Sequence, residues 1–269
     1  MKILGKHSVL VVVLLSLGMV SCGGGGGGGG GSGGGSTPPV QNASPGGIWQ
    51  GRNRLGEPIL GLVAEDGRFQ FIVEDGVPFT QYWGTLTTSG NTISGSNIQV
   101  AYGTTYLGTT TLTGGSITAR QTMAGTLNYT PVAGCSPTIC PPAQSEFITL
   151  TFNPVYNQGG ALSRIVGNWR DVYTGQTVNV NASGVFFSQD AGTGCITNGQ
   201  VTTINTTYNA YSVTYTFSGC RFPYNIQNGT TATGLAFVDT SASPNNAYFA
   251  GQYRVGNTAY AVYAAGPKT

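Results

Sequence analysis

Four cysteines in the second half of the chain are the residues whose spacing points most directly to chemistry. They are Cys135, Cys140, Cys195 and Cys220, an even set that would form lasting disulfides in an oxidising compartment. We predict the local pairing, Cys135–Cys140 and Cys195–Cys220. The second pair agrees with a predicted hairpin of strands 196–205 and 210–219, in which the numbers of facing residues sum to 415. A zinc site of four thiolates is the alternative, although the sequence has no C-x2-C motif.

The fifth cysteine, Cys22, ends a short apolar segment near the start of the chain. Two lysines precede the apolar run 9–17, which is too short to span a bilayer and fits the core of an export signal. Ser21 directly before Cys22 resembles the end of the lipobox of bacterial lipoproteins. The resemblance implies that residues 1–21 are a signal peptide and that Cys22 carries fatty acyl chains, such as palmitate, that anchor the protein in a membrane. The alternative is an ordinary secretory signal followed by a cysteine by chance.

Residues 22–46 are dominated by glycine, serine and proline. A segment with so few side chains to bury cannot offset the entropy cost of ordering, so we expect a disordered tether. The glycine run resembles the leaders of surface lipoproteins such as factor H-binding protein and transferrin-binding protein B. The residue after Cys22 is Gly23 and not an acidic residue, which resembles the sorting pattern of outer-membrane lipoproteins. Whether the folded part would face the periplasm or the medium stays open.

Charge and histidine content exclude several classes of function. The eleven Lys and Arg residues include Lys2 and Lys6, which leaves nine basic against nine acidic residues after the predicted signal. A neutral surface with so few lysines does not suit nucleic-acid binding. The one histidine, His7, also lies in the predicted signal, so histidine-dependent catalysis and histidine metal sites are excluded. We expect no cofactor, no metal and no enzymatic activity.

The rest of the chain predicts an all-β fold made of short antiparallel strands. Period-two alternation marks strands such as 211–218, and pairs such as Asn198-Gly199 mark predicted turns. The triplet 47–49, Gly-Ile-Trp, matches the triplet 167–169, Gly-Asn-Trp, and each is followed by an apolar strand and a phenylalanine strand. This internal repeat predicts two tandem barrel-like domains. The predicted domains are 47–153 and 164–269, with 154–163 as the linker.

A Gly-x-Trp motif at the start of an eight-stranded unit resembles the first strand of lipocalins and other calycins. The resemblance implies that Trp49 and Trp169 each close one end of a small up-and-down barrel. The tandem arrangement behind a glycine tether is also similar to the architecture of the surface lipoproteins named above. Ligand platforms are the other interpretation of the two tryptophans.

Tyrosines are the candidate ligand-binding residues, because a tyrosine offers a large rigid surface with a polar tip. We name Tyr102, Tyr106, Tyr211 and Tyr215 as candidates. The other interpretation is that tyrosine simply suits half-buried strands.

Together these features predict an outer-membrane lipoprotein that is a non-enzymatic binding module. Its ligand would be a protein, a glycan or a small apolar molecule, and an envelope protein or a host protein is a candidate partner. A structural role in the envelope without a ligand is the alternative. A hydrolase that uses carboxylates alone is the remote alternative, and it would require two of the scattered acidic residues to meet in a cleft.

Overall fold

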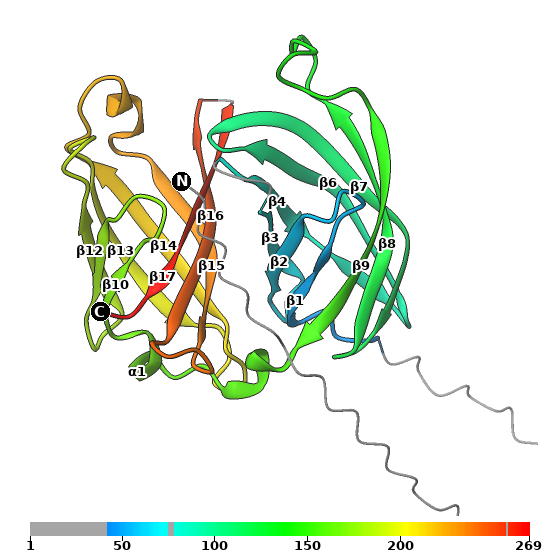
Figure 1. Cartoon of the computed structure of the whole chain (residues 1–269), viewed down its shortest axis with the longest axis horizontal. Coiled ribbons are helices and arrows are strands. Elements are labelled where there is room, and N and C mark those ends of the chain that lie inside the picture. The colour runs from blue at the N-terminus through cyan, green and yellow to red at the C-terminus, as the bar shows by residue number, and fades with distance from the viewer. Residues whose placement is uncertain (1–41, 75–77, 257) are drawn as a thin grey trace, which may run out of the picture. The chain divides into compact units, whose positions relative to one another are not determined.

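The computed structural model describes residues 42–74, 78–256 and 258–269, all within one compact unit, Val40–Thr269. The predicted signal peptide 1–21, Cys22 and most of the tether lie outside the described residues. No helix in the described part is long and apolar enough to cross a membrane. The fold is all-β, as predicted, and consists of two antiparallel sheets that each curl into a barrel-like body (Figure 1).

The first sheet forms a closed barrel. Its strands follow the chain as an antiparallel meander, and two pairings, β1 with β9 and β4 with β6, close a ring of eight strands beside the short β5. The strands are β1 (Gly47–Arg52), β2 (Pro58–Val63), β3 (Arg68–Val73), β4 (Thr80–Thr85), β5 (Thr87–Ser89), β6 (Thr92–Tyr102), β7 (Thr105–Thr118), β8 (Thr122–Pro131) and β9 (Gln144–Asn153). We call this body the first barrel.

The second sheet has eight strands in chain order and curls without a full ladder between its first and last strands. These two edges share one isolated antiparallel bridge, Trp169 with Lys268, and backbone bonds such as Val172 N–H to the Ala265 carbonyl (2.8 Å). The strands are β10 (Gly167–Arg170), β11 (Thr177–Val180), β12 (Val185–Gln189), β13 (Ile196–Thr203), β14 (Tyr211–Ser218), β15 (Thr231–Asp239), β16 (Asn246–Val255) and β17 (Thr258–Pro267). We call this body the second barrel.

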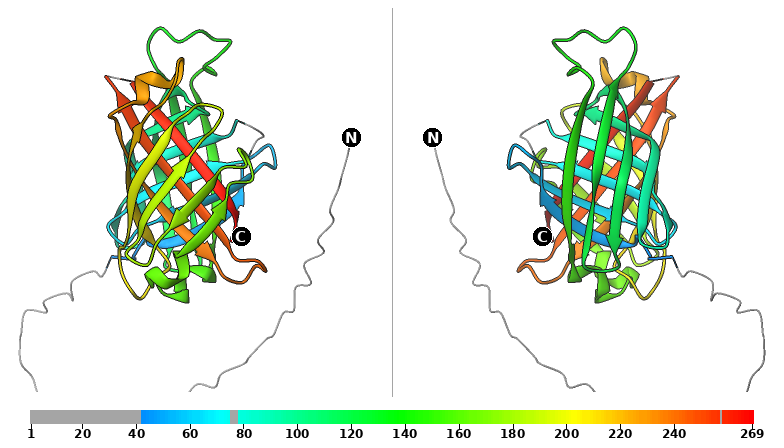
Figure 2. Two further views of the ribbon diagram at one scale, coloured as in Figure 1. Left: turned by 90° about the vertical axis from the view of Figure 1, so that its left-hand side faces the viewer. Right: turned by 90° about the vertical axis from the view of Figure 1, so that its right-hand side faces the viewer.

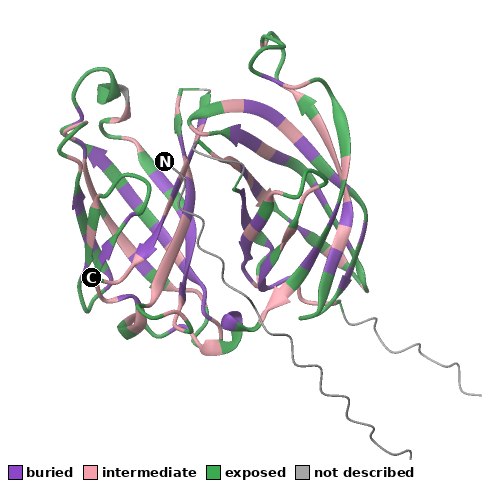
Figure 3. Cartoon of the chain, viewed as in Figure 1, coloured by how far each residue is buried: buried purple, intermediate pink, exposed green. Residues whose placement is uncertain are grey.

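Alternating side chains build the two interiors, as Figure 3 shows along the strands. In β14, Tyr211, Val213, Tyr215 and Phe217 are buried, and three of the four residues between and after them are exposed. In β3, by contrast, five consecutive residues from Phe69 to Val73 are buried. The outer face of β3 is therefore covered as well, and the cover is the second barrel.

The tryptophans of the two Gly-x-Trp triplets, 120 residues apart, occupy equivalent places in the two barrels. The Trp49 indole is fully buried in the first barrel and donates from Nε1 to the Pro45 carbonyl (3.0 Å). The Trp169 indole is buried in the second barrel and donates to the Ile165 carbonyl (2.7 Å). Each indole therefore ties its strand to the residue four positions earlier, so the repeat seen in the sequence is also a repeat of hydrogen bonding.

The barrels share an apolar interface formed by their outer faces. Large side chains of the first barrel, such as Ile72 and Trp83, lie against alanines of β16 and β17, and Leu62 lies in one cluster with Leu235 and Phe237 of β15. Figure 2 shows the strands of the two bodies crossing behind one another. Burying apolar surface on both sides stabilises the contact by about 25 cal/mol per Å².

A buried amide network lies within this interface. Gln81 donates from Nε2 to Gln70 Oε1 (2.8 Å) and to the Gly251 carbonyl (2.8 Å), and Gln70 donates to Gln252 Oε1. Gln70 and Gln81 are 5% and 0% exposed. The network joins Gln70 and Gln81 of the first barrel to β16 of the second and so restricts how the two faces meet, and Gln81 Oε1 has no partner among the described residues.

The connection predicted as a linker, 154–163, contains the 3-10 helix η1 (Pro154–Gln158) and leads into α1 (Leu162–Ile165). It is packed and not free. Val155 and Tyr156 are buried in the same cluster as Ile48 and Phe237, and the Tyr156 hydroxyl donates to Glu65 Oε1 (3.0 Å).

The predicted register of the 196–219 hairpin is wrong by one residue. In β13 and β14 the facing numbers sum to 414, as for Ile196 with Ser218 and Thr203 with Tyr211. The reason is that the ladder ends at Thr203 and the connection is not a tight turn. Its residue Asn209 is fully buried and donates from Nδ2 to the Val155 carbonyl (3.2 Å) and the Val238 carbonyl (2.5 Å).

The turn predicted at Asn198-Gly199 is also wrong, because both residues lie inside β13. Gly199 is needed there for space. A Cβ at this position would lie 2.5 Å from Phe186 Cε1 and 2.5 Å from the Thr214 carbonyl oxygen. The glycine thus lets an aromatic ring of the neighbouring strand lie flat on the backbone.

Candidate ligand cavity

The second barrel encloses a cavity of about 210 Å³. Its walls come from nearly every strand of the sheet, and most of the lining side chains are apolar. Tyr215 and Phe249 line it, with ring centroids 5.7 Å apart. A barrel of eight strands has an interior just wide enough to be filled by side chains or to hold one small ligand.

Small side chains leave this space open. Ala236, Ala247 and Ala264 face the cavity, together with valines such as Val178 and Val213. The same interior would be filled if these positions carried leucine, isoleucine or phenylalanine. An apolar cavity costs stability through lost dispersion contacts, unless a ligand supplies them.

Two polar side chains at the cavity wall, Asp171 and Ser188, are bonded within the protein, and Arg170, Gln176 and Thr197 line the cavity as well. Asp171 accepts from the Thr174 hydroxyl at Oδ2 (2.6 Å) and from the Ala265 N–H at Oδ1 (3.1 Å). Ser188 donates to the Thr177 carbonyl (2.7 Å). Most of the other lining side chains are apolar, so the wall favours a ligand that is largely apolar.

The first barrel is filled by comparison. The space left among its core side chains is about 30 Å³, roughly that of one water molecule. Long aliphatic and aromatic side chains fill the interior of the first barrel: Ile59, Phe69, Phe71, Leu112, Met123, Ile148 and Leu150. A separate cup of about 160 Å³ lies at its mouth, on the end that carries the loop after β8.

The structure does not bring the four candidate tyrosines together. Tyr102 is 41% exposed at the end of β6, and Tyr106 packs at the interface beside Trp83. Tyr211 is fully buried and donates to the Ala161 carbonyl (2.9 Å), and burial raises its pKa to about 12 although the charge of Arg164 lowers it. Of the four, Tyr215 alone lines the cavity, and burial raises its pKa strongly.

Trp169 lines the cavity as well, at the end near α1. Lys268 Nζ lies 5.5 Å from the centre of the indole ring. Trp49, the equivalent residue, packs edge-on against Phe152 at a centroid distance of 5.7 Å. One tryptophan therefore borders open space, and its counterpart is surrounded by side chains.

Sequence reasoning missed most of the cavity wall, including Tyr248, Phe249 and Val262. These residues lie on β16 and β17, where both faces are buried, one in the second barrel and the other against the first. No polar face marks the alternation there. The small residues of these strands are the signal that could have indicated unfilled space.

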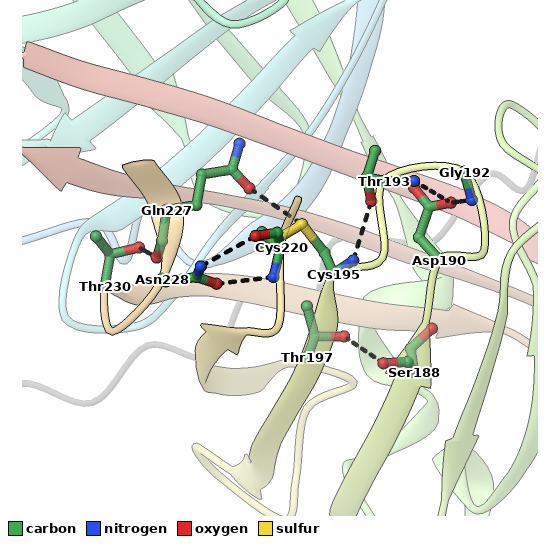
Figure 4. The surroundings of a disulfide bond; sticks show 10 residues. All are labelled: Ser188, Asp190, Gly192, Thr193, Cys195, Thr197, Cys220, Gln227, Asn228 and Thr230. Atoms are coloured by element: carbon green, nitrogen blue, oxygen red, sulfur yellow. Dashed lines mark hydrogen bonds between the residues drawn. A yellow bond between two sulfur atoms is a disulfide. The ribbon is translucent and has the colours of Figure 1, made fainter. Parts of the chain in front are cut away.

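Both predicted disulfides are present. Cys135 joins Cys140 and Cys195 joins Cys220. The second is shown in Figure 4, where Asn228 Oδ1 accepts from the Cys220 N–H (2.8 Å) and Asn228 Nδ2 donates to the Cys220 carbonyl (3.1 Å). Cys195 and Cys220 lie just beyond the ladder, beside Gly194 and Gly219, whose positive φ values turn the two chains. This turn explains how the disulfide forms although the register differs from the predicted one.

Most scattered acidic residues serve in turns. Asp190 Oδ1 accepts from the Gly192 N–H (2.8 Å), and the pKa of Asp190 is lowered, because hydrogen bonds from Thr193 and Gly192 outweigh the opposing effect of burial. Asp239 accepts from Ser241 (2.6 Å). Within the described ranges, no group of three or more His, Cys, Asp or Glu residues is placed to hold a metal ion.

No protein-family model matches the chain, and neither the curated proteins nor the solved structures include a significant match.

Proposed function

We propose that this protein is an outer-membrane lipoprotein, anchored through Cys22, that binds a small apolar ligand inside its second barrel. The observation that supports the binding role is the 210 Å³ apolar cavity among β10–β17. The anchor rests on the sequence before residue 42. A filled first barrel and an open second barrel fit a carrier with one apolar site better than a module that is purely structural.

The volume of the cavity sets the size of the ligand. An engineered apolar cavity of about 150 Å³ binds benzene, whereas pockets for drug-sized molecules run from about 300 Å³. A cavity of 210 Å³ suits a molecule of one or two rings, or a short hydrocarbon chain. Naphthalene is a suitable probe.

The boundary between the two edge strands β10 and β17, which we call the seam, is the route by which a ligand would enter the cavity. The lining includes Trp169 and Arg170 on one edge and 264–266 on the other. Along β13 and β14 eight residue pairs face each other, whereas these two edges share a single bridge and a few backbone bonds. Parting the seam therefore breaks fewer hydrogen bonds than opening one of the long ladders, such as β13 with β14.

Uptake of naphthalene by the full chain, followed by its fluorescence, tests the binding role. We expect saturable binding that Val213→Phe weakens at least tenfold, because the added ring occupies the cavity. Val185→Phe is the matched control, since Val185 is 46% exposed on the outer face of β12. Absence of saturable binding to the unchanged chain would contradict the proposal and favour a structural role in the envelope.

The anchor has its own test. Cys22→Ala should release the protein from the membrane fraction, because the acyl chains are attached through this thiol. Mass spectrometry of the unchanged protein should find the mature N-terminus at Cys22 with lipid attached. An unmodified Cys22 in the mature protein would rule out the anchor and leave the cavity unaffected.

A further inference from the structure

The cup at the mouth of the first barrel has a chemistry different from that of the cavity. Its rim carries two carboxylates, Glu57 and Glu146, and one cation, Arg54. Its floor is apolar and includes Val100 and Leu107. The cup therefore combines an acidic opening with a hydrophobic base.

The hydrogen bonds within the rim leave acceptors in excess. Two neighbours hold Arg54. Its backbone N–H donates to Glu146 Oε1 (2.9 Å), and Nη2 of its guanidinium donates to Gln144 Oε1 (3.3 Å). Glu57 Oε2 accepts from Asn53 Nδ2 (2.5 Å). Each carboxylate has further lone pairs, so a molecule entering the cup meets acceptors and net negative charge.

A buried hydroxyl makes the cup more than an acidic cluster. Thr110 lies on β7, is 1% exposed and lines the cup. Its Oγ1 has no hydrogen-bond partner among the described residues. A buried polar atom without a partner costs free energy, and such atoms are paired by water or by a bound molecule. Thr110 can donate to or accept from a group that reaches the base of the cup.

Glu146 is placed here by the alternation of β9. The strand buries Ile148 and Leu150 on its inner face, and Glu146 shares that face, whereas Phe147 between them is 64% exposed. A carboxylate on the inner face of a barrel strand, where an apolar residue would stabilise the core, indicates a role other than packing.

We propose that this cup binds a small amphiphilic amine, with its ammonium group between Glu57 and Glu146 and its short alkyl chain on the apolar floor. Ammonium satisfies the excess acceptors, and the aromatic ring of Tyr129 in the same wall adds an attractive face for a cation. The Tyr129 hydroxyl donates to the Leu107 carbonyl (2.8 Å), which holds this ring in place. The site is independent of the cavity in the second barrel.

Three four-carbon probes distinguish charge from shape: butylamine, butanol and butyrate. Each is titrated into the ¹⁵N-labelled full chain, and binding is read from the amide shifts of β7 and β9. We expect butylamine to bind at least tenfold more tightly than butanol, and butyrate not to bind. Equal affinity for the amine and the alcohol would overturn the proposal.

Matched variants locate the site. Glu146→Gln and Glu57→Gln should each weaken butylamine binding about tenfold, and Thr110→Val, which keeps the shape, should weaken it several-fold. Asp66→Asn is the control, because it removes the same charge from an exposed turn of the same barrel. Unchanged affinity in both glutamate variants would overturn the proposal. If one of these variants does not fold, the other and the comparison of probes on the unchanged chain decide.

Discussion

The two barrels begin with the same tryptophan motif and the same order of strands, yet their interiors differ. Among the core side chains of the first barrel about 30 Å³ is left, beside a cup of about 160 Å³ at its mouth, whereas the aromatic, valine and alanine side chains of the second leave about 210 Å³. The first is closed by ladders on all sides, and the second is joined at its edges by one isolated bridge and a few further hydrogen bonds. The comparison teaches that one strand plan supports either a packed core or a chamber, depending on side-chain volume.

A charged substitution at the interface between the barrels should lower the free energy of unfolding most, because the interface makes each barrel depend on the other. Leu235 is 4% exposed and packs against the first barrel, so Leu235→Asp would bury an unpaired charge. We expect a loss of at least about 4 kcal/mol in the free energy of unfolding, measured by chemical denaturation. Thr231→Asp, at an exposed position on the same face of β15, should have little effect. Equal stability of the two variants would show that the barrels are independent.

The disulfides predict the next largest effect and differ between the barrels. Cys195 and Cys220 are 25 residues apart, so replacing both by serine should cost about 3.5 kcal/mol by chain entropy. The Cys135–Cys140 bridge spans five residues, and its removal should cost about 2 kcal/mol. Denaturation of the two double variants tests the order. A larger loss for the shorter bridge would contradict it.

Adding a phenylalanine ring should destabilise the filled interior more than the interior that holds the cavity. Val63 is fully buried in the filled barrel, and Val63→Phe should destabilise the protein by about 1–3 kcal/mol. Val213→Phe places the same ring in the cavity and should cost less than about 1 kcal/mol. Thermal denaturation of both variants measures the contrast. If they are equally destabilised, the difference between the interiors is not one of free space.

Raising the pH should have the smallest effect on stability, because the buried tyrosines ionise only in strongly alkaline solution. Burial raises the pKa of Tyr211 and of Tyr253, both in the second barrel, to about 12. In the unfolded chain these phenols ionise near pH 10, so their contribution to stability is complete below pH 10 and is lost as the pH rises through about 12. Phenolate absorbance and circular dichroism should change together in this range. Ionisation of both phenols near pH 10 in the folded protein would contradict the prediction.

The sequence predicted the architecture well where one strand face is polar. Alternation in β14 and the Gly-x-Trp repeat predicted antiparallel strands and two barrel-like bodies, and both are present. The local disulfide pairing was also predicted correctly, although the register used to support Cys195–Cys220 was wrong by one residue. The hairpin register could not, because Asn209 is held by η1 and β15, which lie far away in sequence.

The candidate sites were harder to predict, because cavities are defined by what is missing. Alanines at 236, 247 and 264 mark unfilled space only once their strands are known to face one another. The acidic cup joins Glu57 to Glu146, 89 positions along the chain, through closure of the first barrel. The positions of tyrosines in the sequence do not reveal which strands face one another. The prediction therefore included Tyr102, Tyr106 and Tyr211, which do not line the cavity.

The bridge between Trp169 and Lys268 has a practical consequence for anyone who handles this protein. The Thr269 N–H donates to the Asn168 carbonyl (2.9 Å), so the final two residues complete the wall of the second barrel. An affinity tag or reporter fused after Thr269 would begin at the seam between β10 and β17, where it would widen or block the entrance to the cavity.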